Sequence, residues 1–323
     1  MHTIVIIGAG QLGSRHLQGL ARVETPLSIH LLDPSSASLD RARERFLEVA
    51  GAQSRHTLTA VQQATDLPKD IDLAISATTA DHRLSSLQPV LAHARVKHLV
   101  LEKVLFQKLA EYPAAAALLE RSGAQVSVNC ARRMFAGYQE VKAFFGDETP
   151  HLLQVTGANW GLGCNGIHFC DLFAFLTGDD TLAFDTTQLD AVVHPSKREG
   201  FYEFSGTLVG RQGDRRLELQ ARAEGTIRHL VLIRSATRTV LVDEVGGTAR
   251  FLDEAGGGWV ERPFAVPFQS QLTDIVTTDV LAGRPPQLPG FAASARLHEG
   301  FIGALLGHFN RVTSQQTDVC PIT

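Results

Sequence analysis

Short apolar runs alternate with longer helical segments over the first 127 residues, and this alternation limits the possible folds more than any other feature of the sequence. Neighbouring parallel strands need crossover connections, so the alternation predicts a parallel sheet with helices on both faces. The expected strands are Thr3–Ile7, Leu27–Asp33, His56–Thr59, Ile71–Ser76, His98–Leu101 and Gln125–Val128. The expected helices are Leu12–Val23, Ala37–Val49, Leu84–Ala94 and Lys108–Arg121.

The pattern changes after residue 127, where strands separated by Gly, Pro and polar turns predominate. We therefore predict an α/β protein. An N-terminal Rossmann domain with a doubly wound parallel sheet covers residues 1–127, and a C-terminal α+β domain with a largely antiparallel open sheet covers residues 128–323. The later strands are expected at Leu152–Trp160, Thr186–Val193, Phe201–Val209, Arg215–Arg222, His229–Arg234 and Thr239–Val242. The later helices are expected at Tyr138–Phe145, Ile167–Leu176, Ser270–Leu281 and Phe291–Val312, and Gly256–Gly258 is expected to form a loop or hairpin connection.

Composition excludes several classes of function. Thirty Lys and Arg against 34 Asp and Glu give a formal net charge of -4, so no global positive field attracts nucleic acid or anionic lipid. The sequence has no basic leader and no apolar stretch near 18 residues, so we expect a cytoplasmic protein that is not bound to membranes. Four cysteines without a CxxC pair indicate reduced thiols. Cys164 and Cys170 flank His168, but their spacing fits no standard zinc module, and we expect no metal.

A glycine-rich turn follows the first expected strand directly. Thr3–Ile7 runs into Gly8-Ala9-Gly10-Gln11-Leu12-Gly13, and helical spacing begins at Leu12. In this spacing the first glycine permits a tight turn, the second lets the backbone approach a pyrophosphate, and the third allows close helix–strand packing. The helix N-terminus supplies free N–H groups and the positive end of a dipole. These features predict a dinucleotide site; the alternative is a turn that only closes a βα unit.

Asp33 ends the second expected strand, 20 residues after Gly13. The dinucleotide fingerprint places an acidic side chain there, where it binds a ribose 2′-hydroxyl. A carboxylate repels a 2′-phosphate, and the following Pro34-Ser35-Ser36 supplies no cation to offset it. We therefore expect NAD to be preferred over NADP. FAD and S-adenosylmethionine are lesser alternatives, and Asp33 could instead cap the next helix.

Glu102 and Lys103 follow the apolar strand His98–Leu101, at the carboxyl edge where open parallel sheets bind ligands. A lysine in this place can act as an acid or a base when burial or a nearby positive charge lowers its pKa. The alternative is an ordinary exposed lysine beside a glutamate that leads a helix. His82 comes just after the fourth strand and is expected to line the nicotinamide end of the cleft, unless it only starts a helix.

Asn165, His168 and Asp171 recur at i, i+3 and i+6 on a helix whose other positions are nearly all apolar. Buried polar groups without partners cost roughly 1–3 kcal/mol each, so these side chains should face one another, a second polar element or a cavity. A histidine is suited to general acid–base work, and a carboxylate one turn away could orient it. The alternative is a structural Asp–His pair with an Asn cap. Arg133 follows the first domain and is expected either to grip an anionic or hydroxylated substrate or to be solvated.

Taken together, these residues resemble the Gfo/Idh/MocA family, the group of glucose–fructose oxidoreductase and inositol dehydrogenase, over nearly the whole chain. The matching segments are Gly8–Gly13 with Asp33 for the nucleotide fingerprint, Thr78–His82 for the loop after the fourth strand, Glu102-Lys103 for the Glu-Lys-Pro motif, Arg133 with Tyr138 for the entry to the second domain, and Gly166–Asp171 for the Gly-x-His-x-x-Asp signature. Two positions depart from the family: Val104 replaces the proline, and Cys164 stands where many members have aspartate.

The resemblance implies NAD-linked oxidation or reduction of a sugar, cyclitol or sugar nucleotide, and a homodimer or homotetramer that associates through the open sheet. It implies that Lys103 and His168 are catalytic, and that Asp171, Asn165 and Arg133 bind or support the substrate. The expected cofactor-binding residues are Gly8, Gly10, Gln11, Leu12, Gly13, Asp33, Thr78, His82, Glu102 and Lys103. Two other functions stay open: an NAD-dependent glycosidase that uses transient oxidation, and a non-enzymatic NAD-binding sensor.

Overall fold

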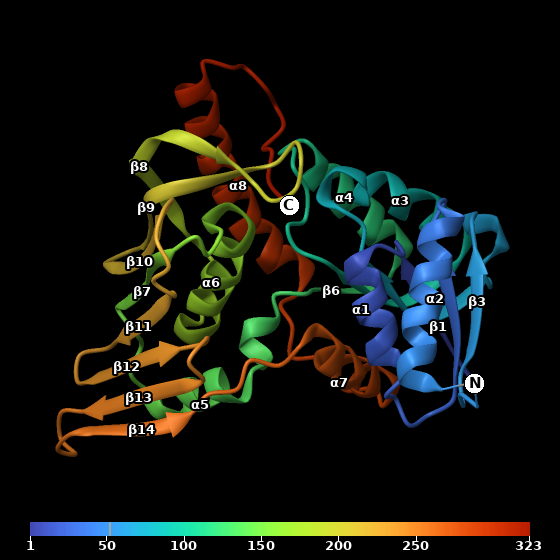
Figure 1. Cartoon of the computed structure of the whole chain (residues 1–323), viewed down its shortest axis with the longest axis horizontal. Helices are drawn as coiled ribbons and strands as arrows, with labels where there is room; N and C mark the ends of the chain where they lie inside the picture. Colours follow the sequence, from blue (N-terminus) through green and yellow to red (C-terminus); the bar gives the residue numbers. More distant parts are fainter. Residues whose placement is uncertain (52) are drawn as a thin grey trace. The chain divides into compact units, whose positions relative to one another are not determined.

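The computed structural model describes residues 1–51 and 53–323, which form two compact units (Figure 1). The first unit comprises Met1–Phe106, Ala110–Asn129 and Pro267–Ala292. The second comprises Gln107–Leu109, Cys130–Val266 and Ala293–Thr323. A late segment of the chain therefore belongs to the same unit as the N-terminus.

The first unit contains a six-stranded, wholly parallel sheet in the order β3-β2-β1-β4-β5-β6. The strands are β1 (His2–Ile7), β2 (Leu27–Leu32), β3 (Thr57–Val61), β4 (Asp70–Ser76), β5 (Arg95–Leu101) and β6 (Gln125–Val128). Ile4–Ile7 of β1 are buried, because a central strand is covered on both faces. The strand order reverses between β1 and β4, and such a switch point is where doubly wound sheets bind ligands. The predicted Rossmann sheet is confirmed.

Five α-helices and a short 3₁₀ helix complete the described first unit. They are α1 (Gln11–Leu20), α2 (Ser36–Ala50), η1 (Ala64–Asp66), α3 (Ala80–His93), α4 (Glu111–Ser122) and α7 (Gln269–Leu281). Helix α7 packs closely on α1, because Gly19 has no side chain at their contact: a Cβ there would lie 2.6 Å from Cβ of Thr273. Helix α1, which follows the glycine-rich turn, is thus held by an element from near the end of the chain.

The second unit contains an eight-stranded sheet in the order β14-β13-β12-β11-β7-β10-β9-β8. Within this sheet, β7 and β10 form the only parallel pair among the described strands. The predicted largely antiparallel sheet is therefore confirmed. The strands are β7 (Leu152–Ala158), β8 (Ala183–Pro195), β9 (Tyr202–Gln212), β10 (Arg215–Arg222), β11 (Leu230–Arg234), β12 (Arg238–Asp243), β13 (Thr248–Asp253) and β14 (Trp259–Pro263).

The sequence pattern did not predict the last two strands. Strands β13 and β14 form an antiparallel hairpin, and Gly256–Gly258 lies in the connection between them, as expected for a loop or hairpin. Every residue of β14 is exposed, so the strand lacks the alternation of buried and exposed positions that marks a half-buried strand in a sequence.

Helix α6 (Leu162–Thr177) packs on the sheet of the second unit beside β9 and β10 (Figure 1). Its N-cap is Gly161, whose φ of 74° is in the left-handed region that glycine adopts freely. Alternation along β7 and β10 places Leu153, Val155, Leu217 and Leu219 in the core. The remaining helices of this unit are η2 (Ala131–Met134), α5 (Ala136–Phe145) and α8 (Phe291–Thr313), whose first two residues belong to the first unit.

Candidate nucleotide-binding and active-site residues

The three glycines of the turn after β1 lie in three different structural environments. Gly8 has a φ of +98°, which other residues rarely adopt. A Cβ on Gly13 would lie 1.8 Å from the carbonyl oxygen of Gly8, so only glycine fits where α1 meets the turn. A Cβ on Gly10 would meet no atom within 4 Å, so this side of the turn is open. The open side is a cradle that leaves room for a ligand group to approach the backbone.

Helix α1 presents its free amides at this turn. Gly10 is its N-cap, and the first turn, which contains Gln11, Leu12 and Gly13, carries no acidic side chain. The first N–H groups of a helix lack partners within the helix, and the dipole makes this end positive. Both properties suit an anion such as a pyrophosphate.

A cavity of about 490 Å³ lies beside the turn, in the size range of small-molecule sites. It brings together five of the predicted cofactor residues, Gly8, Gly10, Asp33, Thr78 and His82. The other lining residues were not predicted to bind the cofactor, and they are Ile7, Leu32, Pro34, Gln62, Ala64, Ala77, Thr79, Ser85, Ser86 and Pro89. Most of these are small or apolar side chains with no chemical signature, and only the folded chain gathers them.

Asp33 is fixed by the backbone at one side of this cavity. Its Oδ2 accepts a hydrogen bond from the N–H of Ala9 at 2.7 Å, and its Oδ1 accepts one from the N–H of Ser35 at 2.8 Å. Each carboxylate oxygen can accept more than one hydrogen bond, so both retain capacity for ligand hydroxyls. The turn and the acidic side chain are therefore joined directly, although Ala9 and Asp33 are 24 positions apart in the sequence.

Arg83 of α3 connects the Thr78 loop to the segment after Lys103. It is fully buried and donates to the carbonyls of Val104, Leu105 (2.7 Å) and Thr78 (2.5 Å). Burial lowers its pKa to about 10, with the carboxylate of Glu102 opposing the shift. The peptide bond between Lys103 and Val104 is cis. Arg83 carried no signal in the sequence, because an arginine in an amphipathic helix is usually solvated.

Glu102 and Lys103 follow β5, but neither lines the cavity beside the glycine turn. Glu102 is buried and contacts His16 of α1 at 2.8 Å and Asn129. Burial alone would raise its pKa, but the hydrogen bond and charge of His16 and the hydrogen bond from Asn129 outweigh burial and hold the pKa below its ordinary value. Lys103 is partly exposed.

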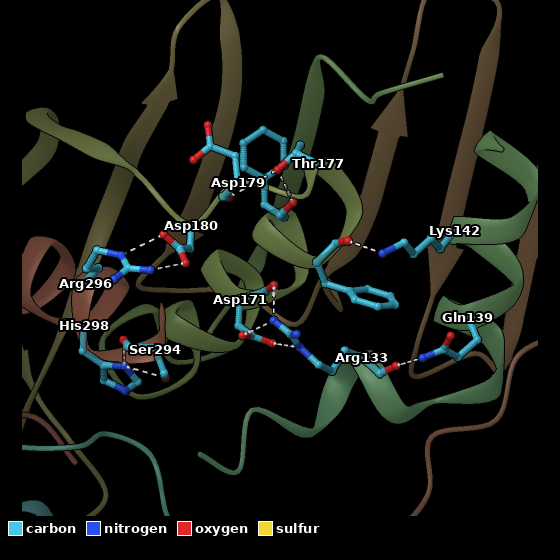
Figure 2. Close-up of polar contacts among 12 residues, drawn as sticks. Arg133, Gln139, Lys142, Asp171, Thr177, Asp179, Asp180, Ser294, Arg296 and His298 are labelled. Carbon is cyan, nitrogen blue, oxygen red and sulfur yellow. Dashed lines mark hydrogen bonds and ion pairs between the residues drawn. The ribbon is translucent and has the colours of Figure 1, made fainter. Parts of the chain in front are cut away.

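In the second unit, Arg133 and Asp171 bind each other. Arg133 Nε lies 2.8 Å from Asp171 Oδ2, and its NH2 lies 2.5 Å from Oδ1, a bidentate pair between η2 and α6 (Figure 2). Asp171 is buried, which raises its pKa to about 6 although the charge of Arg133 opposes this. The predicted second polar element facing the α6 stripe is thus η2.

The neighbouring Arg132 holds a second buried carboxylate, which the sequence analysis missed. Its guanidinium donates to both oxygens of Glu244 at 2.8 and 2.9 Å, and it lies 4.1 Å from the centre of the Phe169 ring. Tyr138 donates to Glu244 at 2.6 Å, and His229 contacts it at 3.1 Å. Burial alone would raise the pKa of Glu244, but Arg132, His229 and Tyr138 together hold it well below the ordinary range.

His168 and Asn165 lie on α6, in the second unit, whereas Lys103 lies in the first. His168 is half-buried, and the adjacent Phe169 packs against Trp160 and His229 with ring centroids 5.6 and 6.0 Å apart. Asn165 donates to the carbonyl of Trp160 at 2.7 Å, as an amide near a helix start often does. The N–H groups of Gly163 and Cys164 donate to the carboxylate of Glu203, so a side chain of β9 caps α6.

The described part of the chain holds no cluster of three or more His, Cys, Asp or Glu side chains arranged to bind a metal ion. None of the helices in residues 1–51 and 53–323 combines the length and apolar character that crossing a bilayer requires.

Comparison with solved structures finds the same fold in proteins of low identity. UDP-N-acetylglucosamine 3-dehydrogenase from Acidithiobacillus ferrooxidans is 16% identical with a TM-score of 0.71, covering 94% of this chain and 97% of that chain. Scyllo-inositol dehydrogenase from Lactobacillus casei, solved with NAD(H) and scyllo-inositol, is 15% identical with a TM-score of 0.68, covering 96% and 97%. An oxidoreductase from Agrobacterium radiobacter, in complex with NAD+, L-tartaric acid and magnesium, is 14% identical with a TM-score of 0.69, covering 97% and 99%.

The curated proteins include no significant match to this sequence. A family model does match: residues 2–130 fit the GFO_IDH_MocA model, described as an oxidoreductase family with an NAD-binding Rossmann fold. The matched range contains the glycine turn, Asp33, Thr78 and Lys103, which are among the positions that carried the resemblance in this part of the sequence. Residues 2–130 thus match the model of the family that the sequence resembles.

Proposed function

We propose that this protein is an NAD(H)-dependent oxidoreductase that acts on a secondary hydroxyl or ketone of a sugar, cyclitol or sugar nucleotide. The observation that carries the proposal is the open cradle at Gly10, flanked by a cavity that holds Asp33. Two proteins of the same fold, the UDP-N-acetylglucosamine and scyllo-inositol dehydrogenases, support the substrate class.

The cavity favours NAD over NADP. Asp33 would accept hydrogen bonds from the ribose hydroxyls, and a 2′-phosphate beside it would meet a like charge. Neither lysine nor arginine is among the described residues that line the cavity, so nothing there would offset that repulsion. Gly10, Gln11 and Leu12 would bind the pyrophosphate through backbone amides, with Thr78 and His82 at the cavity wall.

Lys103 and His168 have the chemistry for a proton relay. NAD, when bound, supplies the hydride acceptor. Removing a hydride from a secondary alcohol requires loss of the hydroxyl proton, which an amine or an imidazole can accept, and ketone reduction requires the same proton in return.

Arg133, Asp171 and Asn165 would position the substrate. The Arg133–Asp171 pair offers guanidinium N–H donors and carboxylate acceptors in one place, a combination that suits a ring bearing several hydroxyls. Because Arg133 is neutralised by Asp171, the pair suits a polyol better than a free anion. We further propose a cytoplasmic homodimer or homotetramer that associates through the exposed face of the eight-stranded sheet.

The test is turnover of a panel of inositols, free sugars and UDP-sugars with NAD+ or NADP+, followed by NADH absorbance. We expect activity with one class and NAD+, and its loss in both Lys103→Ala and His168→Ala. Lys97→Ala, on the exposed part of β5, and His151→Ala serve as controls that retain activity. Full activity in both site variants would refute the relay.

The same panel distinguishes the two alternative functions. Sugar release from a glycoside without NADH accumulation would instead indicate a glycosidase, and NAD binding without any turnover would indicate a sensor.

A further inference from the structure

Two consecutive arginines of η2 pair with two buried carboxylates that come from different elements. Arg133 binds Asp171 of α6 through its Nε and Nη2 groups. Arg132 donates to both oxygens of Glu244, which follows β12, at 2.8 and 2.9 Å. The Asp171 and Glu244 side chains are only 1% and 5% exposed. A helix of four residues has little stability of its own, so we expect these pairs to fix where η2 lies.

The Glu244 carboxylate is also held by residues outside η2. The Tyr138 hydroxyl of α5 donates to it at 2.6 Å, and His229 Nε2, just before β11, lies 3.1 Å from it. The Arg132 guanidinium lies 4.1 Å from the centre of the Phe169 ring of α6. Glu244 is thus a buried anchor that joins η2 to α5 and to the segment before β11.

Arg133 can serve a ligand while it binds Asp171. A guanidinium has five N–H donors, and the contacts with Asp171 use Nε and Nη2, not Nη1. The Arg133 side chain is 18% exposed, so a ligand can reach it. Because the guanidinium is planar and rigid, its donors point in fixed directions once η2 and Asp171 hold the side chain. A shift of η2 would therefore change where the Nη1 donors point.

We propose that Glu244 is a positioning residue for the substrate: by holding Arg132 it fixes η2, and so fixes the direction in which Arg133 presents its guanidinium. This inference rests on the proposed function, because it assumes that Arg133 binds the substrate. The role requires the carboxylate itself, since the amide of a glutamine has one accepting oxygen and cannot receive both N–H donors of Arg132 in the same way.

The kinetic test uses Glu244→Gln, which keeps the size of the side chain and removes one acceptor. We expect the KM of the substrate to rise about tenfold or more, while kcat and the NAD dissociation constant from calorimetry each change by less than about threefold. The reason is that Arg133 contributes to substrate binding and not to the hydride transfer itself. In an Arg133→Lys background, Glu244→Gln should raise KM no further.

Asp180→Asn is the matched control. Asp180 accepts two hydrogen bonds from the Arg296 guanidinium in the same unit, at 2.9 and 2.7 Å (Figure 2), so this variant also breaks a bidentate pair. Its KM should equal that of the wild type. An unchanged KM in Glu244→Gln, an equal rise in Asp180→Asn, or a further rise in the Arg133→Lys background would overturn the inference.

A second readout needs neither cofactor nor substrate. Nitrogen-15 NMR can follow the Nε–H group of Arg133, whose signal is identified by its loss in Arg133→Lys. In Glu244→Gln this hydrogen should exchange with water about tenfold faster or more, because the ion pair with Asp171 opens more often, whereas Asp180→Asn should leave the rate unchanged. If Glu244→Gln does not fold, Arg132→Lys takes its place, since it keeps the charge but loses the planar fork, and the same changes are expected.

The two readouts separate this inference from the proposed function. An unchanged exchange rate of the Arg133 Nε–H group in an active Glu244→Gln enzyme refutes this inference alone. A faster exchange rate in a protein that turns over no sugar, cyclitol or sugar nucleotide refutes the proposed function alone.

Discussion

The glycine-rich turn of the first unit and the α6 region of the second unit are stabilised by different interactions. The α6 region comprises helix α6, the short helix η2 and Glu244. The turn comprises Gly8–Gly13, and its shape depends on glycine at three positions. A side chain would strain the backbone at Gly8, clash at Gly13 and fill the open side at Gly10. The α6 region depends on ion pairs between distant residues: Arg133 with Asp171, 38 positions apart, and Arg132 with Glu244, 112 positions apart. The stability of the turn should therefore depend mainly on shape, whereas the stability of the α6 region should also depend on charge.

The largest effect is expected at the turn, from Gly13→Ala. One methyl group would lie 1.8 Å from the backbone oxygen of Gly8, and backbone cannot move aside as a flexible side chain can. We expect a loss of about 4 kcal/mol or more in the free energy of unfolding of the first unit, at the upper end of overpacking effects. Urea denaturation followed by circular dichroism measures it. A stable, folded Gly13→Ala protein would contradict the structural account of the turn.

The next effect tests the charge dependence of the α6 region, through Glu244→Gln. The variant keeps the shape but leaves the Arg132 guanidinium buried beside a neutral amide, which should cost about 3 kcal/mol in unfolding free energy. Glu261→Gln is the matched control, since it removes an exposed partner of Arg250 on the same sheet and should cost less than about 0.5 kcal/mol. Similar losses in the two variants would remove the contrast between buried and exposed pairs.

The two buried carboxylates of this region should respond to pH in opposite directions. The pKa of Asp171, about 6 in the folded protein, exceeds its ordinary value of about 4, so the native state holds a proton that the unfolded chain has released between these pH values. The contribution of Asp171 to stability is thus present at about pH 4 and lost as the pH rises through 6. The pKa of Glu244 is lowered, so its contribution is present above the ordinary pKa and is lost progressively as the pH falls below that value.

Comparison with Asp171→Asn measures this sign. The unfolding free energy of the wild type relative to the variant should decrease by about 2 kcal/mol between pH 4 and pH 7. The same comparison with Glu244→Gln should show no such decrease over this interval. A wild-type advantage over Asp171→Asn that grew with pH would mean that Arg133, not burial, dominates the carboxyl group.

The smallest effect on folding is expected at Gly10, the partner of Gly13 in the same turn. Gly10→Ala should change the unfolding free energy by less than about 1 kcal/mol, because its Cβ would meet no neighbour within 4 Å. The methyl group would instead occupy the cradle, and NAD affinity should fall about tenfold or more, equivalent to about 1.4 kcal/mol. Calorimetric titration with NAD+ checks this, and unchanged affinity would place the pyrophosphate elsewhere.

The contrast also explains what the sequence could predict. The turn, the parallel sheet and Asp33 could be predicted because local rules determine them: glycine spacing, apolar strands and an acidic residue at a strand end. Glu244 and His229 lie far along the chain from Arg132 and have no spacing relation to it, so only the folded second unit brings them together. Strand β14 could not be predicted for a different reason: every one of its residues is exposed, so its sequence has no alternation of buried and exposed positions.

Arg133 illustrates what the sequence could not predict in the α6 region. Its position suggested a substrate contact, and the periodicity of α6 required a polar partner for Asp171. Nothing in the sequence indicated that Arg133 is this partner. The structure joins them in one bidentate pair. A buried polar stripe thus predicts that a partner exists, but the identity of the partner depends on tertiary packing.

The most direct test of the proposed enzyme is a crystal structure with NADH and the substrate identified by the activity panel. We predict the pyrophosphate against the amides of Gly10–Leu12, a ribose on Asp33, and both the Lys103 amine and the His168 imidazole within about 3 Å of the substrate oxygen at the reacting carbon. A bound cofactor whose nicotinamide and substrate lie beyond the reach of both side chains would contradict the account.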